Sequence, residues 1–248
     1  MTVLRLLLAG VVAACSLSSA NAAFQTFSYA GAPVSIPDAS AAGSNLDIVI
    51  PTGAQFSMLQ FQSLTVNMST GTANTATGAH SWVGDLFITL THLESGASMH
   101  VMRRPGANTG SSVGDSTNFG GDYTFSNLLT LTNPLQPRVI DNAAPAGSGV
   151  NVTNGVYLPT TNSLAGGGGP LFTGETATNF NTTFDGIGQM GGTWRLNISD
   201  NAGGDIGQIV GWSFTADAVS TPAPAAVWMG LAGAGALGLL RRRISRTA

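Results

Sequence analysis

The segment Asp200-Asn201-Ala202-Gly203-Gly204-Asp205 places two carboxylates and several backbone carbonyls in one turn-forming stretch. Oxygen atoms of these kinds are the ligands that Ca²⁺ prefers in proteins. Asp85 is a further candidate ligand. The same residue types also fit a turn in which Asp and Asn side chains bond their own backbone, without a metal. The sequence therefore predicts either a calcium site formed by Asp85, Asp200 and Asp205 or a metal-free turn.

The chain contains the residue spacing of a hydrolase nucleophile motif, but the surrounding sequence does not predict the secondary structure that the motif requires. Gly110-Ser111-Ser112-Val113-Gly114 fits Gly-x-Ser-x-Gly, but that nucleophile motif must lie between a strand and a helix. Here it lies in a Gly-, Asn- and Ser-rich stretch that leads to another expected strand. The three histidines, His80, His92 and His100, lack the spacing of a zinc motif. We therefore expect no catalysis by this chain.

The composition is unusually poor in charge. Charged residues make up 8% of the chain, against about 25% in typical soluble proteins, and lysine is absent. All 12 acidic residues lie in the span 23–220, together with only four arginines: Arg103, Arg104, Arg138 and Arg195. Nucleic acid requires a basic face that neutralises its phosphates. The charge balance excludes nucleic acid as a partner and is compatible with a cation-binding extracellular module.

The elements that must position these residues follow a period of two, which is typical of strands. In the range 82–93, for example, Leu86, Ile88 and Leu90 alternate with polar residues. Strands are expected over 46–50, 56–68, 82–93, 98–103, 123–131, 193–199 and 208–216. This pattern predicts an all-β fold, an antiparallel β-sandwich or jelly roll, over 23–220.

The range 141–181 departs from this pattern because it is rich in Gly, Asn, Thr and Ala and includes four consecutive glycines at 166–169. Its apolar residues form only short islands around Val152 and Val156. Such a composition buries little surface. We expect an inserted surface loop that carries one short strand at most.

Two stretches together carry a family pattern. The first is His80-Ser81-Trp82-Val83-Gly84-Asp85-Leu86, and the second is Gly192-Thr193-Trp194-Arg195-Leu196-Asn197-Ile198-Ser199-Asp200, followed by Gly207 and Gly211-Trp212-Ser213-Phe214. In order and separation they resemble the P domain (P/Homo B domain), which follows the catalytic domain in kexin- and furin-like convertases and in bacterial subtilases.

The resemblance implies a β-sandwich, calcium binding, and a subtilisin-like protease as a packing partner. The chain has no room for the protease domain itself. The family positions would be His80, Gly84, Asp85, Leu86, Trp194, Asp200, Gly207 and Trp212. From their size alone, the two tryptophans are expected to pack between the sheets, with ligand stacking as the alternative.

The amino-terminal range 1–22 has the organisation of a signal peptide. Arg5 is followed by an apolar run, and Ala20 and Ala22 form a small-x-small site for signal peptidase. The alternative is lipidation at Cys15, the only cysteine. With ordinary cleavage, the mature domain has no thiol and no disulfide.

The carboxyl-terminal range 221–248 has the organisation of a second targeting signal. Pro222-Ala223-Pro224 precedes an apolar run over 225–240 and the cluster Arg241-Arg242-Arg243. As one transmembrane helix this run spans about 24 Å, a marginal length for a bilayer core of about 30 Å. Three arginines hold the end of the chain in the cytoplasm.

This tail resembles the PEP-CTERM sorting tail of Gram-negative bacteria, with Ala223 where that family usually has glutamate. The resemblance implies processing by an exosortase and delivery to the cell surface or the extracellular polysaccharide matrix. A permanent single-pass anchor in the inner membrane is the alternative. We expect an exported adhesive or structural module that binds polysaccharide or a surface protein, or else an accessory of a separate subtilisin-like protease.

Overall fold

The structure, a computed structural model, describes residues 22–52, 56–105, 116–127, 149–160 and 178–220. Most of this part of the chain is strand, arranged in two sheets. The expected all-β class is therefore confirmed. Residues 23–218 form one unit with a continuous hydrophobic core.

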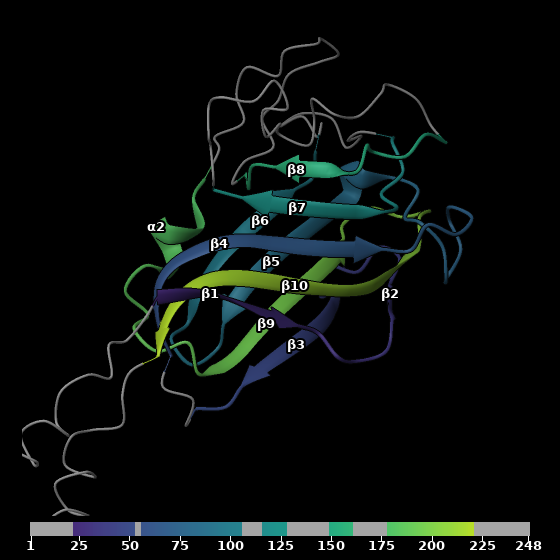
Figure 1. Cartoon of the computed structure of the whole chain (residues 1–248). Helices are drawn as coiled ribbons and strands as arrows, with labels where there is room; N and C mark the ends of the chain where they lie inside the picture. Colours follow the sequence, from purple (N-terminus) through teal and green to yellow (C-terminus); the bar gives the residue numbers. More distant parts are fainter. Residues whose placement is uncertain (1–21, 53–55, 106–115, 128–148, 161–177, 221–248) are drawn as a thin grey trace, which may run out of the picture. The chain divides into compact units, whose positions relative to one another are not determined.

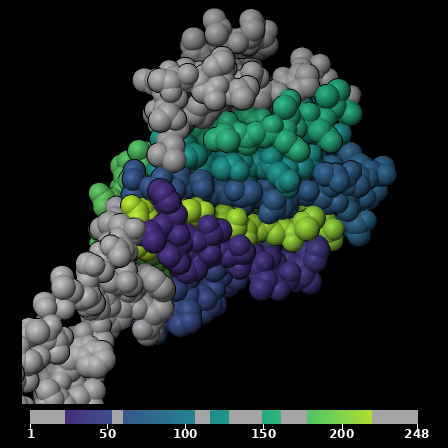
Figure 2. All heavy atoms as spheres, viewed as in Figure 1, coloured from purple at the N-terminus to yellow at the C-terminus, as the bar shows by residue number. Residues whose placement is uncertain are grey.

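The larger sheet has the strand order β1-β10-β4-β7-β8, and β2 also pairs with β10 (Figure 1). Figure 2 shows β1, β10, β4 and β7 as successive bands on one face of the molecule. The bounds are β1 Ala22–Ser28, β2 Val34–Ile36, β4 Phe56–Met68, β7 Asp122–Ser126, β8 Gly155–Tyr157 and β10 Gly207–Ser220. The β7–β8 pair is parallel, which departs from the expected antiparallel arrangement.

The smaller sheet has the strand order β3-β9-β5-β6, and its three pairings are antiparallel. The bounds are β3 Ser44–Ile50, β9 Gly192–Asp200, β5 Leu86–His92 and β6 Ala97–Arg103. Every second residue of β5 is buried, as the period of two predicts for a strand with one face in the core. The two sheets turn such faces toward each other and enclose the core between them.

Aromatic rings from both sheets meet in the core. Phe61 of β4 stacks on Phe214 of β10 at 5.3 Å between ring centroids, and Trp194 of β9 lies 4.8 Å from Phe214. The short helix α2, Phe180–Phe184, adds its two end residues to this group, with Phe180 at 4.5 Å from Phe61. The contact between Trp194 and Phe214 joins the two sheets directly.

The expected strand 56–68 coincides with β4, and the other expected ranges each contain or overlap an observed strand. The expected start of 82–93 was wrong because Val83–Asp85 forms a 3₁₀ turn and β5 begins at Leu86. The strands β1 and β2 and the helix α2 were not anticipated. Residues 128–131 of the expected strand 123–131 lie outside the described ranges.

In its described part, the segment 141–181 carries one short strand, β8, as expected, but the expectation that it buries little was wrong. Val152 and Tyr157 are 1% and 3% exposed, and Phe180 is fully buried, so this segment contributes to the core. Its strand β8 extends the larger sheet beside β7. Other apolar residues of this segment stay exposed, with Val150 at 46% and Val156 at 49%.

A bulge interrupts the β5–β6 pairing. Ile88 pairs with Met102 and Thr89 with His100, so Val101 is an extra residue in β6. Val101 and Met102 are consequently both buried. His100 and Arg103, which would face opposite sides of a regular strand, are both exposed.

No helix in the described ranges has the length and apolar character to cross a membrane. The apolar run 225–240 lies outside those ranges.

We predict that Phe61→Ala lowers the free energy of unfolding by about 3–5 kcal/mol, because it empties the middle of the aromatic group. Phe24→Ala is the matched control, since Phe24 is 67% exposed. Its expected change is within about 0.5 kcal/mol. Chemical denaturation of the full chain measures both, and similar losses in the two variants would contradict this core.

Candidate functional site

Four residues of the two quoted stretches, His80, Asp85, Asp200 and Gly207, come together where β5 begins and β9 ends. Leu86 pairs with Asp200 across these strands, and the Asn201 N–H donates to the Asp85 carbonyl at 2.9 Å. His80 and Asp200, which are 120 positions apart in the chain, thereby lie in one largely buried junction. We define this buried junction as His80, Asp85, Arg104, Asp200 and Asp205.

His80 and Asp200 form the deepest part of the junction, and both side chains are fully buried. The Trp82 N–H donates to His80 Nδ1 at 3.3 Å, which makes Nδ1 an acceptor. His80 Nε2, 3.4 Å from Asp200 Oδ2, is then the nitrogen that donates to the carboxylate. Asp200 Oδ1 accepts from the Ala202 N–H at 3.0 Å.

Gly207 lies directly against His80. A Cβ atom at residue 207 would come within 2.7 Å of the His80 backbone nitrogen and Cα. No L side chain fits at that distance, so the close approach of β10 to His80 requires glycine.

Asp85 is 4% exposed and pairs with Arg104, whose Nη2 lies 3.1 Å from Asp85 Oδ1. Arg104 also donates from Nε to the Gly84 carbonyl at 3.0 Å. Burial raises the pKa of Asp85, Arg104 opposes this shift, and the charges of Asp200 and Asp205 raise the pKa further. The three carboxylates predicted as calcium ligands therefore lie close enough to influence one another.

Each of the three carboxylates accepts a hydrogen bond from a protein donor, and further bonds close the loop between Asp200 and Asp205. Ser81 Oγ donates to Asp205 Oδ1, and Asp38 Oδ1 accepts from the Gly204 N–H at 2.8 Å. Asn74 closes the same loop by accepting from the Ile206 N–H at 3.0 Å. Within the described ranges, no group of three or more His, Cys, Asp or Glu side chains could hold a metal ion. The metal-free turn accounts for these bonds, and calcium at Asp85, Asp200 and Asp205 stays a prediction.

Trp194 and Trp212 are 0% and 2% exposed, so their expected burial is confirmed. Trp194 Nε1 donates to the Met190 carbonyl at 3.1 Å. Trp212 lies beside Phe214 of the same strand, at 6.0 Å between ring centroids. Neither ring is placed to stack on an external ligand.

The β5–β6 hairpin holds a second polar group that sequence reasoning missed. His92, at the end of β5, is 2% exposed and packs on Trp194. Its Nδ1 lies 2.9 Å from Ser95 Oγ, and its Nε2 lies 3.6 Å from Glu94 Oε2. The Thr193 N–H, which donates to Glu94 Oε2 at 2.6 Å, lowers the pKa of Glu94. The spacing His-x-Glu-Ser at the end of a strand was the available signal.

The outer face of the smaller sheet carries rows of bonded polar side chains. Asn197 Nδ2 donates to Asn45 Oδ1 at 2.8 Å, and Arg195 forms a bidentate pair with Asp47 at 2.8 Å for each bond. Thr91 bonds Ser98 at 2.7 Å, and Thr89 bonds His100 Nδ1 at 3.0 Å. The half-buried Phe87 completes this face beside Arg103.

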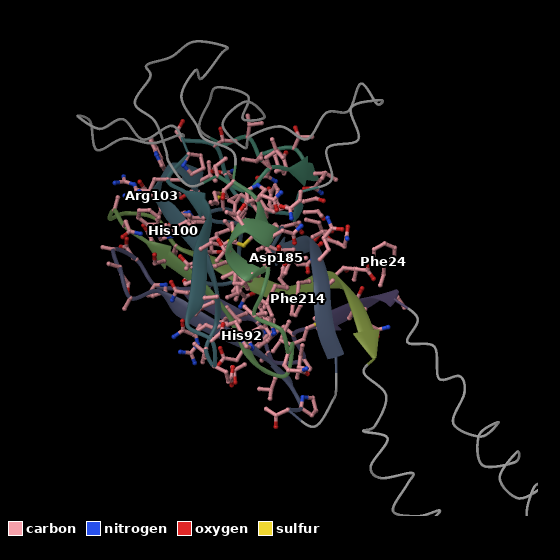
Figure 3. All side chains as sticks on the ribbon, turned by 90° about the vertical axis from the view of Figure 1, so that its left-hand side faces the viewer. Phe24, His92, His100, Arg103, Asp185 and Phe214 are labelled. Atoms are coloured by element: carbon pink, nitrogen blue, oxygen red, sulfur yellow. The ribbon has the colours of Figure 1, made fainter. Side chains whose placement is uncertain are left out.

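Arg103 and Arg104 are adjacent in the chain, but Arg103 lies on the outer face of the smaller sheet, whereas Arg104 pairs with the buried Asp85. The guanidinium of Arg103 lies over the Phe87 ring, 5.6 Å from its centroid. The ring centroid of His100 lies 5.8 Å from that of Phe87. Figure 3 shows His100 and Arg103 on the side of the molecule opposite Phe24. Burial and the charge of Arg103 lower the pKa of His100, so Arg103 carries the positive charge here near neutral pH.

Of the predicted processing residues, all but Ala22 lie outside the described ranges. Ala20 of the cleavage site lies outside the described ranges, as do the sorting residues Pro222, Ala223, Pro224 and Arg241 to Arg243. Ala22 is the first residue of β1.

No protein-family model matches this chain, and no curated protein or solved structure matches it either.

We predict that Arg104→Ala lowers the free energy of unfolding by about 2–3 kcal/mol at neutral pH, because a buried carboxylate loses its charged partner. The loss shrinks toward pH 4, since Asp85, whose pKa is already raised, takes up a proton there. Chemical denaturation at both pH values measures this.

Arg103→Ala is the control, because Arg103 is exposed and lies on the outer face. Its expected effect is within about 0.5 kcal/mol at either pH. A loss for Arg104→Ala that did not change with pH would contradict the pairing with Asp85.

Proposed function

We propose that this chain is an exported, non-catalytic β-sandwich module that acts by binding, at the cell surface or in the extracellular polysaccharide matrix. The observation that carries this proposal is the division of polar groups in the sandwich. At its ends they bond one another inside the protein, whereas on the outer face of the smaller sheet hydroxyl, amide, imidazole and guanidinium groups bond one another while still open to solvent.

The state of two of the three histidines, His80 and His92, supports binding rather than catalysis. His80 is fully buried, and both its ring nitrogens have protein partners. His92 is enclosed against Trp194, and the hydroxyl of Ser95 beside it also accepts from the Ala97 N–H at 3.2 Å. A general base must reach the proton of a bound substrate, and these two rings are committed to packing and turn closure.

Sorting through the tail is supported by the sequence order. The strand β10 ends at Ser220, two residues before Pro222, so the sorting motif follows directly after the folded unit. In this mechanism the signal peptide directs export, the apolar run 225–240 holds the chain in the inner membrane, and an exosortase removes the tail.

The buried junction favours the P-domain-like form of the sandwich, because the quoted motif positions His80, Asp85, Asp200 and Gly207 contact one another or their immediate neighbours. This observation also supports a second candidate function, that of an accessory which packs on a separately encoded subtilisin-like protease and stabilises it.

We predict that the full chain, expressed in an exopolysaccharide-forming Gram-negative bacterium that has an exosortase, is recovered outside the cell with the polysaccharide. Its intact mass should correspond to a chain that begins at Ala23 and has lost the residues after the Pro222-Ala223-Pro224 motif. Because protein donors close the Asp200–Asp205 loop, retention should persist in the presence of a calcium chelator.

The matched control carries Pro222→Ala and Pro224→Ala, which should keep its tail and remain with the membrane fraction. A cytosolic chain with Met1 intact would refute export. A mature chain that leaves the polysaccharide and copurifies with a subtilisin-like protease would instead favour the accessory role, and a lipid mass at Cys15 would establish the lipoprotein alternative.

A further inference from the structure

The bulge in β6 gives the outer face a feature that a regular strand could not. Because Val101 and Met102 both point inward, Arg103 emerges on the same face as His100. Bulges commonly re-aim a side chain in this way beside functional sites. The result is a group of three neighbouring side chains, Phe87, His100 and Arg103, which we call the Arg103 group.

Arg103 differs from the other arginines in the described ranges. Arg104 and Arg195 are paired with Asp85 and Asp47, whereas Arg103 has no carboxylate within ion-pair distance among the described residues. Its contact is the Phe87 ring, which fixes the guanidinium on the sheet without neutralising it. An exposed cation held in this way, in a span dominated by acidic residues, is complementary to an anionic group of a partner.

The surroundings of Arg103 narrow the class of partner. Further along the outer face, the half-exposed Thr89, Thr91 and Asn197 and the exposed Ser98 present hydroxyls and an amide, while the charges of Arg195 and Asp47 pair with each other. The centre of a protein interface is depleted in charge and rich in buried apolar side chains, and this face offers Phe87 alone near Arg103. A hydroxyl-rich ligand that also carries a carboxylate fits this face better than a protein does.

We propose that the Arg103 group binds a carboxylated sugar unit of an acidic polysaccharide. Arg103 donates to the sugar carboxylate, and Phe87 positions the guanidinium and packs against the C–H groups of the sugar ring. His100 and Thr89 lie beside them as hydrogen-bonding partners for sugar hydroxyls. This inference rests on the proposed binding function and specifies its ligand class and its surface.

The test uses the full chain in detergent and polygalacturonate as the probe, with its methyl ester as the neutral counterpart of the same backbone. Wild-type protein should bind polygalacturonate at least tenfold more tightly than the ester. Arg103→Gln should weaken binding about tenfold, the usual worth of one charge-assisted hydrogen bond. Phe87→Leu should weaken it severalfold without changing the melting temperature.

Arg195→Gln is the matched control, since it removes the same charge from the same face, but from a guanidinium already paired with Asp47. Its expected effect on affinity is less than twofold. Equal losses for Arg103→Gln and Arg195→Gln, or no preference over the ester, would overturn the inference, because either result means that only net charge matters. Polyglutamate bound as tightly as polygalacturonate would overturn the assignment to a glycan.

These outcomes are distinct from a failure of the proposed function. Export and retention in the matrix are measured in cells and do not depend on Arg103 being the contact residue. A protein that is retained outside the cell but does not bind polygalacturonate would retain its proposed function and refute this ligand.

Discussion

The contact between aromatic rings of the two sheets is the interaction on which the rest of the structure depends. Trp194 from the smaller sheet meets Phe214 of the larger one, and Phe61 and the ends of α2 extend this group. Cys15, the only cysteine, lies before the described ranges, so no disulfide can hold these sheets together. With few charges in the chain, burial of apolar surface must supply most of the stability.

The polar residues follow from this constraint. Where β5 begins and β9 ends, ionisable side chains enter the protein, and each is stabilised there by a partner: His80 with Asp200, and Asp85 with Arg104. Burying such groups without partners would cost more than the core could offset. Since these groups are committed inside, the polar residues that remain available are those on the outer faces. The bulge at Val101 adds Arg103 to one of them.

Sequence reasoning found the strands whose inward residues are mostly apolar, such as β4, β9 and β10. It missed β1 because this strand has few inward apolar residues, and Phe24 within it is exposed. It grouped Asp85, Asp200 and Asp205 as candidate calcium ligands but did not find their protein partners, since Arg104 reaches Asp85 only through the hairpin and its bulge. The adjacent apolar pair Val101-Met102 between His100 and Arg103 was the signal for that bulge.

The central claim is that the inner faces of this sandwich are used for packing and that the outer face of the smaller sheet is used for binding. Amide hydrogen exchange of the full chain, measured with and without polygalacturonate, tests this claim most directly. The account predicts slower exchange in β5 and β6 when the polysaccharide is present, with β1 and β10 unchanged. Slowing in β1 and β10 instead, or in the Asp200–Asp205 loop alone, would contradict it.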